Sequence, residues 1–483
     1  MKLKYILALV TCLSALPLTA QVNAEVDLLK QQLQAVKDAF EKAQAESRRQ
    51  IEELTRKLDN LTLRQATNEQ QQLKRFMEAP VTTGPRSAAR LEKPWSASDP
   101  ITLARAGSAY MNVSFGALLN LGWSTASDPS QQLQLGDHDP LQRGFSLRNA
   151  EIALDGAVDP YFKGFASIVF KLDQNNETHL ELEETYLQST SLPVNLQLKA
   201  GQFFAAFGRQ NPLHPHQWAF VDQPLILNRA FGPEGMRNLG AQLSWLVPVP
   251  FYTEAFLGVF NGNSGQAFSF RNPGEDDGTG ANRHAGRATL GRGLRGPGDL
   301  LFVPRLASSF DLSDSQTLLV GASGAFGPND TGARARTEIY GVDLFWKWKP
   351  ANAGRGFPFV SFQTEALYRR FEAGADPTAL PGPLPAETLG DWGFYSQLLW
   401  GFQPRWVAGL RGEYVTGNQG AFDSLDVFRG DRTRISPALT WHPSEFSKIR
   451  LQYNYDRGQH FSDQHSVWLQ MEFSLGAHSV HKY

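Results

Sequence analysis

The chain has 483 residues, a formal net charge of −2 and a single cysteine. A net charge so close to zero argues against a nucleic-acid binder, so we expect no nucleic-acid partner. The mean hydropathy of −0.34 excludes a helical membrane protein but not a β-barrel, in which only every second strand residue faces lipid.

The first residues have the layout of a secretory signal peptide. Two lysines precede an apolar run that is too short to span a membrane, and small residues end cleavage sites at Ala20 and Ala24. We prefer cleavage after Ala24, which predicts a signal peptide over residues 1–24. Cys12 lies inside it and fits a lipoprotein cysteine poorly. The exported chain then has no cysteine and no disulfide.

Residues 25–79 contain no glycine or proline and are rich in Gln, Glu, Lys, Arg and Ala. Two runs of apolar residues follow heptad spacing: Leu29, Leu33, Val36 and Phe40, then Ile51, Leu54, Leu58 and Leu61. This spacing predicts an α-helical coiled coil, and a single solvated helix is the alternative. Several prolines and glycines then indicate a linker over residues 80–106.

From about residue 107 the pattern changes to a period of two, which is typical of strands with two different faces. The clearest case runs from Lys448 to Asp456, where apolar or aromatic residues alternate with charged or amide residues. The pattern predicts sixteen strands: 107–121, 143–157, 161–172, 180–190, 194–203, 238–248, 252–262, 301–312, 316–327, 336–349, 357–371, 391–402, 405–416, 431–442, 446–457 and 465–477.

Three features favour a membrane barrel over a soluble β-sandwich, which shows a similar alternation. Tight turns alternate with long loops, notably 122–142, 204–237, 263–300 and 372–390. Aromatic residues gather at the strand ends, and the chain ends in Tyr483. The predicted fold is therefore an all-β membrane barrel of about 16 antiparallel strands over residues 107–483, preceded by the coiled coil.

The sequence resembles the phosphate-selective porin O and P family. The similar residues are Leu147 to Gly156, Asp159-Pro160 and Gly201 to Gly208, and the likeness covers most of the chain. The segment from Asn211 to Arg237 is similar to a branch with members described as metal-regulated outer-membrane receptors. The resemblance implies passive uptake of small solutes. The family's phosphate selectivity depends on a lysine cluster that this region lacks, so the resemblance does not extend to phosphate selectivity.

The loop 204–237 is the third long loop, and in porins this loop commonly narrows the barrel. It combines charges of both signs with many apolar residues, so it predicts a constriction rather than a solvated surface loop. The predicted constriction residues are Arg209, His214, His216, Asp222, Arg229, Glu234 and Arg237. Strand residues expected to face the lumen are Lys199, Arg369, Arg411, Glu413, Arg434, Lys448, Arg450 and Glu472. Their basic excess suggests an anion preference.

Metal binding and catalysis have weaker support. His214 and His216, or His478 and His481, offer only two ligands where three or four are usual, so no metal and no other cofactor is expected. Glu183 and Glu184 are adjacent on a strand, where successive side chains point to opposite faces and cannot share a substrate. No catalytic motif is present, and we expect no enzyme.

The sequence therefore predicts a porin in a bacterial outer membrane, with its N-terminal segment in the periplasm. Expected partners are small hydrophilic solutes or anions, outer-membrane lipid, the barrel-assembly machinery and two further copies in a homotrimer. Two alternatives stay open: a structural tether that acts through the coiled coil, and a metal-linked uptake receptor. A receptor of the plugged type would need roughly 22 strands.

Overall fold

The computed structural model describes Gln34 and residues 100–127, 136–140, 143–173, 175–276, 282–423, 426 and 429–476. The predicted signal peptide and, apart from Gln34, the predicted coiled coil lie outside the described residues. So do Tyr483 and both C-terminal histidines. The described barrel belongs to one compact unit, Pro94–Tyr483. Within the described ranges, no helix is long and apolar enough to cross a membrane.

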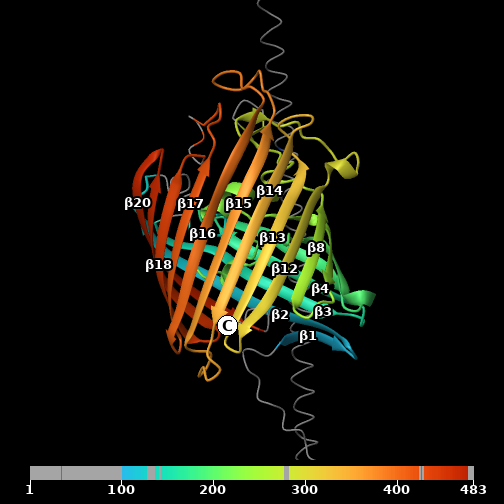
Figure 1. Cartoon of the computed structure of the whole chain (residues 1–483), viewed down its shortest axis with the longest axis vertical. Coiled ribbons are helices and arrows are strands. Elements are labelled where there is room, and N and C mark those ends of the chain that lie inside the picture. Colours follow the sequence, from blue (N-terminus) through green and yellow to red (C-terminus); the bar gives the residue numbers. More distant parts are fainter. Residues whose placement is uncertain are drawn as a thin grey trace, which may run out of the picture. The chain divides into compact units, whose positions relative to one another are not determined.

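Sixteen antiparallel strands form a closed ring, because the last strand pairs with the first (Figure 1). The ring consists of β2 (Ala109–Ser124), β3 (Gly144–Ala157), β4 (Phe162–Leu172), β5 (Thr178–Ser189), β6 (Leu196–Phe204), β7 (Arg237–Leu246), β8 (Tyr252–Phe260), β12 (Leu301–Ser313), β13 (Gln316–Pro328), β14 (Arg336–Trp348), β15 (Phe359–Ala373), β16 (Glu387–Gln403), β17 (Trp406–Gly417), β18 (Arg432–Ser444), β19 (Ser447–Gly458) and β20 (Phe461–Leu475). All sixteen predicted strands are confirmed. The largest shifts are at β16 and β20, which begin earlier than predicted.

The predicted linker is wrong at its end, since Ile101–Ala106 forms a further strand, β1. It pairs with β2 from Ile101 opposite Val113 to Ala106 opposite Ala109. On the same edge of β2, the pairing with β20 reaches only as far as Phe115, and β3 occupies the other edge. β1 therefore covers the part of β2 that the ring leaves as an open edge, where unpaired backbone groups would otherwise be exposed.

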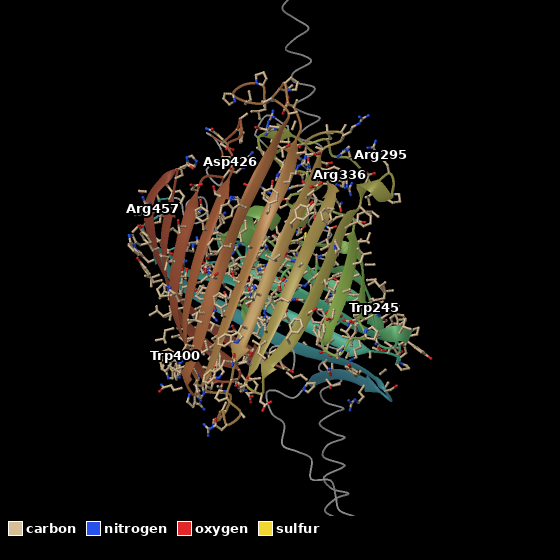
Figure 2. All side chains as sticks on the ribbon, in the orientation of Figure 1. Trp245, Arg295, Arg336, Trp400, Asp426 and Arg457 are labelled. Carbon is tan, nitrogen blue, oxygen red and sulfur yellow. The ribbon has the colours of Figure 1, made fainter. Side chains whose placement is uncertain are left out.

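The two faces of the wall alternate as the sequence predicts. On β19, Leu451 is 50% exposed on the outside, whereas Arg450 is 3% exposed on the inside. Figure 2 shows Trp245 and Trp400 toward the end of the barrel that carries the short turns, with Arg336 at the opposite end. An outer apolar band with aromatic residues at its border is typical of a lipid-facing surface.

Leu451→Arg is expected to impair barrel assembly in a bilayer by about 2–4 kcal/mol, because it places a charge on the lipid face near the middle of its strand. Arg450→Leu changes the same strand on its inner face and should assemble. Heat-dependent gel mobility and urea unfolding in lipid vesicles measure both effects. Equal assembly of the two variants would contradict the assignment of the faces.

The connections between the strands carry the remaining elements. Between β8 and β12 lies a three-stranded sheet of β9 (Glu275–Asp276), β10 (Asn282–His284) and β11 (Arg287–Ala288). Single 3-10 turns are Pro193–Asn195, Pro215–Gln217, Gly265–Ala267 and Pro297–Asp299. The segment that connects β6 to β7, residues 205–236, is called the inner loop below. It contains the helix α3 (Leu225–Phe231).

Candidate functional site

The inner loop packs inside the barrel. Most of its buried apolar residues belong to one cluster with residues of the wall. Its members include Phe203, Ala205, Phe207, Leu225, Ile226, Leu227, Ala230, Phe231, Met236, Phe260, Ile339, Leu367, Tyr395 and Val415. The two ends of the loop meet, because the Ala205 amide donates to the Met236 carbonyl at 2.9 Å. The loop therefore leaves the wall and returns to it at one place, with its apolar side chains removed from water.

Asp222 is the polar centre of this packing and is 1% exposed. Its carboxylate accepts hydrogen bonds from Arg411 (2.6 Å), Arg434 (2.8 Å), Gln452 (2.6 Å) and Asn454 (3.0 Å), which come from β17, β18 and β19. Burial raises the pKa of this carboxyl, but Arg411 and Arg434 outweigh burial and lower the pKa below its ordinary value. One loop aspartate is thus held by three consecutive wall strands.

Two further wall residues hold α3. The Glu413 carboxylate accepts the Leu225 amide at 2.7 Å, near the first turn of the helix, and also pairs with Arg411 at 2.7 Å. Arg369 donates to the Arg229 carbonyl at 2.9 Å, near the last turn, and pairs with Asp391 at 2.6 Å. Both ends of α3 are therefore bonded to charged side chains of the wall.

The first half of the inner loop is bonded to β19. Lys448 donates to the His216 carbonyl at 3.0 Å and pairs with Glu472 at 2.5 Å. Arg450 donates to the Trp218 carbonyl at 2.9 Å. Apart from Lys199, the residues expected from the sequence to line the lumen thus bind the loop or one another from the inner face of the wall.

A cavity of about 680 Å³ lies between this part of the loop and the wall. Its lining includes the cationic side chains Arg209, Lys347, Lys448 and Arg450, together with His216, and no Asp or Glu among the described residues. The Arg209 guanidinium lies 3.9 Å from the centre of the Phe345 ring. The cavity is on the side of the short turns, because its strand residues come from the ends that those turns connect.

Of the seven predicted constriction residues, only Arg209 and His216 line this cavity. Arg229 donates to the backbone carbonyls of residues 429–430, at 3.2 and 3.1 Å. Arg237 forms ion pairs with Glu181 and Glu234 and is almost fully buried. Of the three loop arginines that the sequence suggested for the pore, the structure places only Arg209 against the cavity.

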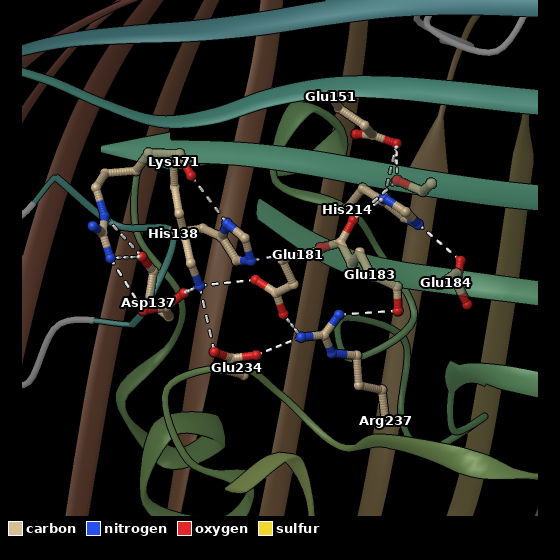
Figure 3. Close-up of polar contacts among 12 residues, drawn as sticks. Asp137, His138, Glu151, Lys171, Glu181, Glu183, Glu184, His214, Glu234 and Arg237 are labelled. Carbon is tan, nitrogen blue, oxygen red and sulfur yellow. Dashed lines mark hydrogen bonds and ion pairs between the residues drawn. The ribbon is translucent and has the colours of Figure 1, made fainter. Parts of the chain in front are cut away.

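A cluster of carboxylates and histidines lies where the inner loop meets β3 and β5 (Figure 3). The expectation that Glu183 and Glu184 face opposite sides is wrong. On the neighbouring strand Ser167 pairs with Glu184 and Ile168 with Leu182, so Glu183 is the extra residue of a β-bulge. A bulge changes the direction of a side chain, and here both carboxylates contact His214.

His214 is the centre of this cluster. Its Nδ1 lies 2.9 Å from Glu183 and 3.2 Å from Glu151, and its Nε2 lies 2.9 Å from Glu184. His216 Nδ1 lies 3.0 Å from the other oxygen of Glu151. Burial lowers the pKa of the His214 imidazole, but Glu183 and Glu151 outweigh it and hold the pKa well above its ordinary value.

Lys199 and Glu234, the remaining predicted residues, border this cluster. Lys199 lies 3.6 Å from Glu184 and over the ring of Tyr186. Glu234 belongs to an adjacent network, in which Arg148, Lys171 and Arg237 pair with Asp137, Glu181 and Glu234. The spacing of the sequence gives no signal for either network, because each joins strands to loops that are distant along the chain.

Comparisons with known proteins agree with the fold. No family model matches the chain. An uncharacterized protein of Aquifex aeolicus (strain VF5) is 30% identical over 357 residues, which are 71% of this chain and 71% of that protein.

Among solved structures, the outer membrane channel DcaP of Acinetobacter baumannii is 11% identical, with a TM-score of 0.50, and the alignment covers 77% of this chain and 99% of that one. OprB of Pseudomonas putida is 11% identical, with a TM-score of 0.46, over 76% of this chain and 94% of that one. At this level of identity the likeness to DcaP describes the fold alone, a closed antiparallel barrel of the outer-membrane type.

Proposed function

This chain belongs to the same family as the uncharacterized Aquifex aeolicus protein, and we propose that it is an outer-membrane channel for passive diffusion of small hydrophilic solutes, with a preference for anions. A closed ring of strands satisfies every ladder hydrogen bond internally, which allows such a ring to span a bilayer. The apolar outer face and the polar lumen support this location.

The cationic cavity beside the inner loop is the observation that carries the proposal. Arg209, Lys347, Lys448 and Arg450 line it without a carboxylate among the described residues. The positive charge of Lys448 is balanced by the carboxylate of Glu472. Arg209, in contrast, donates a hydrogen bond to the neutral side chain of Gln363 at 3.2 Å. Charges in a narrow, partly dry passage act more strongly on ions than charges in bulk water. A permeating anion would therefore be favoured beside Arg209 and Lys347.

The test is the reversal potential in planar bilayers under a potassium chloride gradient. The wild-type channel is expected to reverse at a potential of anion-selective sign. The double variant Arg209→Gln, Lys347→Gln should shift the reversal potential toward zero or toward cation selectivity, because it removes two lumen charges without cutting the contacts of Asp222.

Arg370→Gln is the matched control. Arg370 pairs with Glu338 and Glu372 on the exposed outer surface, so its loss should leave selectivity unchanged. A folded wild-type protein without conductance would refute the proposal that the protein is a channel. A conducting, cation-selective wild type would refute only the anion preference.

The inner loop is the proposed constriction, residues 1–24 are the proposed signal peptide, and residues 25–79 are the proposed periplasmic coiled coil. A homotrimer inserted by the barrel-assembly machinery stays a prediction. Phosphate selectivity is not proposed, because the lysine cluster on which it depends is missing.

A further inference from the structure

The cluster around His214 has the composition of a metal site. Three side chains, Glu151, His214 and His216, offer ligand atoms that all lie within 4.8 Å of one another, and all three are buried. Glu183 adds a fourth oxygen 2.9 Å from the same nitrogen of His214 that faces Glu151. In a tetrahedral zinc site, bonds of about 2.0–2.2 Å put neighbouring ligand atoms roughly 3.3 Å apart. The separations of His214 Nδ1 from Glu183 and Glu151, 2.9 and 3.2 Å, are close to that value, and His216 Nδ1 lies 3.0 Å from the second oxygen of Glu151.

The second nitrogen of His214 is held as a metal-binding histidine requires. Its Nε2 lies 2.9 Å from the Glu184 carboxylate. A ligating histidine commonly donates its other ring N–H to a carboxylate, which directs the remaining nitrogen at the metal. The Ser167 hydroxyl likewise donates to Glu151 at 2.8 Å and orients that carboxylate. The bulge at Glu183 makes the arrangement possible, because it turns both glutamates of β5 toward one ring.

The charge balance of the cluster differs from that of its neighbour. In the adjacent network, Arg148, Lys171 and Arg237 balance three carboxylates (Figure 3). In the His214 cluster, Glu151, Glu183 and Glu184 are 2%, 0% and 6% exposed. Lys199 offsets Glu184 at 3.6 Å, and His138 lies 3.6 Å from the outer oxygen of Glu183.

Buried carboxylates are costly unless a positive charge compensates them. With both imidazoles of His214 and His216 neutral, as in a metal complex, Glu151 and Glu183 leave two negative charges. One divalent cation would balance them.

We propose that Glu151, Glu183, His214 and His216 form a binding site for one divalent transition-metal ion, with Zn²⁺ as the representative probe, and that Glu184 is its positioning residue. Imidazole and carboxylate ligands without thiolate suit zinc, manganese or iron rather than calcium or magnesium. The ion would join the inner loop to β3 and β5, whereas Asp222 bonds the loop to β17, β18 and β19.

The experiment measures metal content and affinity in the full protein, purified in detergent and stripped with a chelator. After equilibration with ZnCl₂ and desalting, elemental analysis should find about one zinc per chain. Glu151→Gln should reduce the zinc content to background. Glu184→Gln should keep the site but weaken its affinity by about tenfold to a hundredfold, as expected for a residue that orients a ligand.

His179→Gln is the matched control, since His179 lies at the exposed beginning of β5, where it pairs with Asp173 at 3.3 Å. It should bind zinc as the wild type does, and heat-dependent gel mobility reports folding of each variant. If Glu151→Gln does not fold, the wild type is loaded with Co²⁺, whose visible absorption bands report nitrogen and oxygen ligands at a defined geometry.

Three results would overturn the proposal. These are a folded wild type that retains no zinc, equal zinc content in folded Glu151→Gln, and full displacement of zinc by an equal concentration of Ca²⁺ or Mg²⁺. Because the readout is metal content, its outcome is independent of whether the protein conducts ions.

Discussion

Asp222→Ala is expected to lower the free energy of unfolding by about 3–5 kcal/mol and to raise the channel conductance. The substitution leaves Arg411 and Arg434 buried without the carboxylate between them, and loss of one partner of a buried ion pair is strongly destabilising. It also removes the four hydrogen bonds that the Asp222 carboxylate accepts from β17, β18 and β19, so the middle of the loop should be held less firmly against the wall. Urea unfolding in vesicles and single-channel recording measure the two effects.

Asp173→Ala is the control for this prediction. Asp173 pairs with His179 at an exposed position, and removal of an exposed ion pair is expected to change the stability little. Protease cleavage within the loop should increase in Asp222→Ala alone. Equal stability and equal conductance in the two variants would show that Asp222 does not hold the loop in place.

Replacement of residues 207–234 by Gly-Ser-Gly-Ser is expected to raise the single-channel conductance several-fold while the barrel still folds. The ends of the loop already meet at Ala205 and Met236, so a short connection can join β6 to β7. The ring of strands keeps all its ladder bonds, because none of them involves the deleted segment. Conductance in planar bilayers and heat-dependent gel mobility are the measurements.

A second shortened loop separates this effect from loop trimming in general. Asp376 and Leu384 exchange two backbone hydrogen bonds of 2.9 Å, so Gly-Gly can replace residues 377–383. This variant should conduct like the wild type. If the inner-loop variant is folded and also conducts like the wild type, ions do not pass the position that the loop occupies.

The barrel could be predicted from the sequence because the pattern that defines a barrel strand lies within the strand itself. A wall with lipid on one side and polar groups on the other requires alternation along each strand, and β19 shows it from Lys448 to Asp456. The position of the inner loop also followed from composition, since residues such as Trp218 and Leu225 would not be left in water. β1 was missed because it covers an edge, a role that depends on where β20 ends.

The charged contacts could not be predicted, since they depend on register and on distant partners. Glu183 turns inward only because the bulge shifts β5 by one residue against β4, and nothing in the local pattern reveals that shift. Arg229 and Arg237 carried the same sequence signal as Arg209. Only the folded chain shows that the first two bind carbonyls and carboxylates in buried places.

The contacts of the inner loop also set an order on folding. His214 and His216 meet partners 30 and 65 residues earlier in the chain, whereas Leu225 and His216 meet partners 188 and 232 residues later. Contacts of such long range make folding slow. The helix α3 contacts β15, β16 and β17, so the apolar segment around Leu225 is fully covered only when these late strands of the ring are in place. Docking of the loop and closure of the barrel therefore belong to the same late stage, when an unfinished chain is most exposed to aggregation.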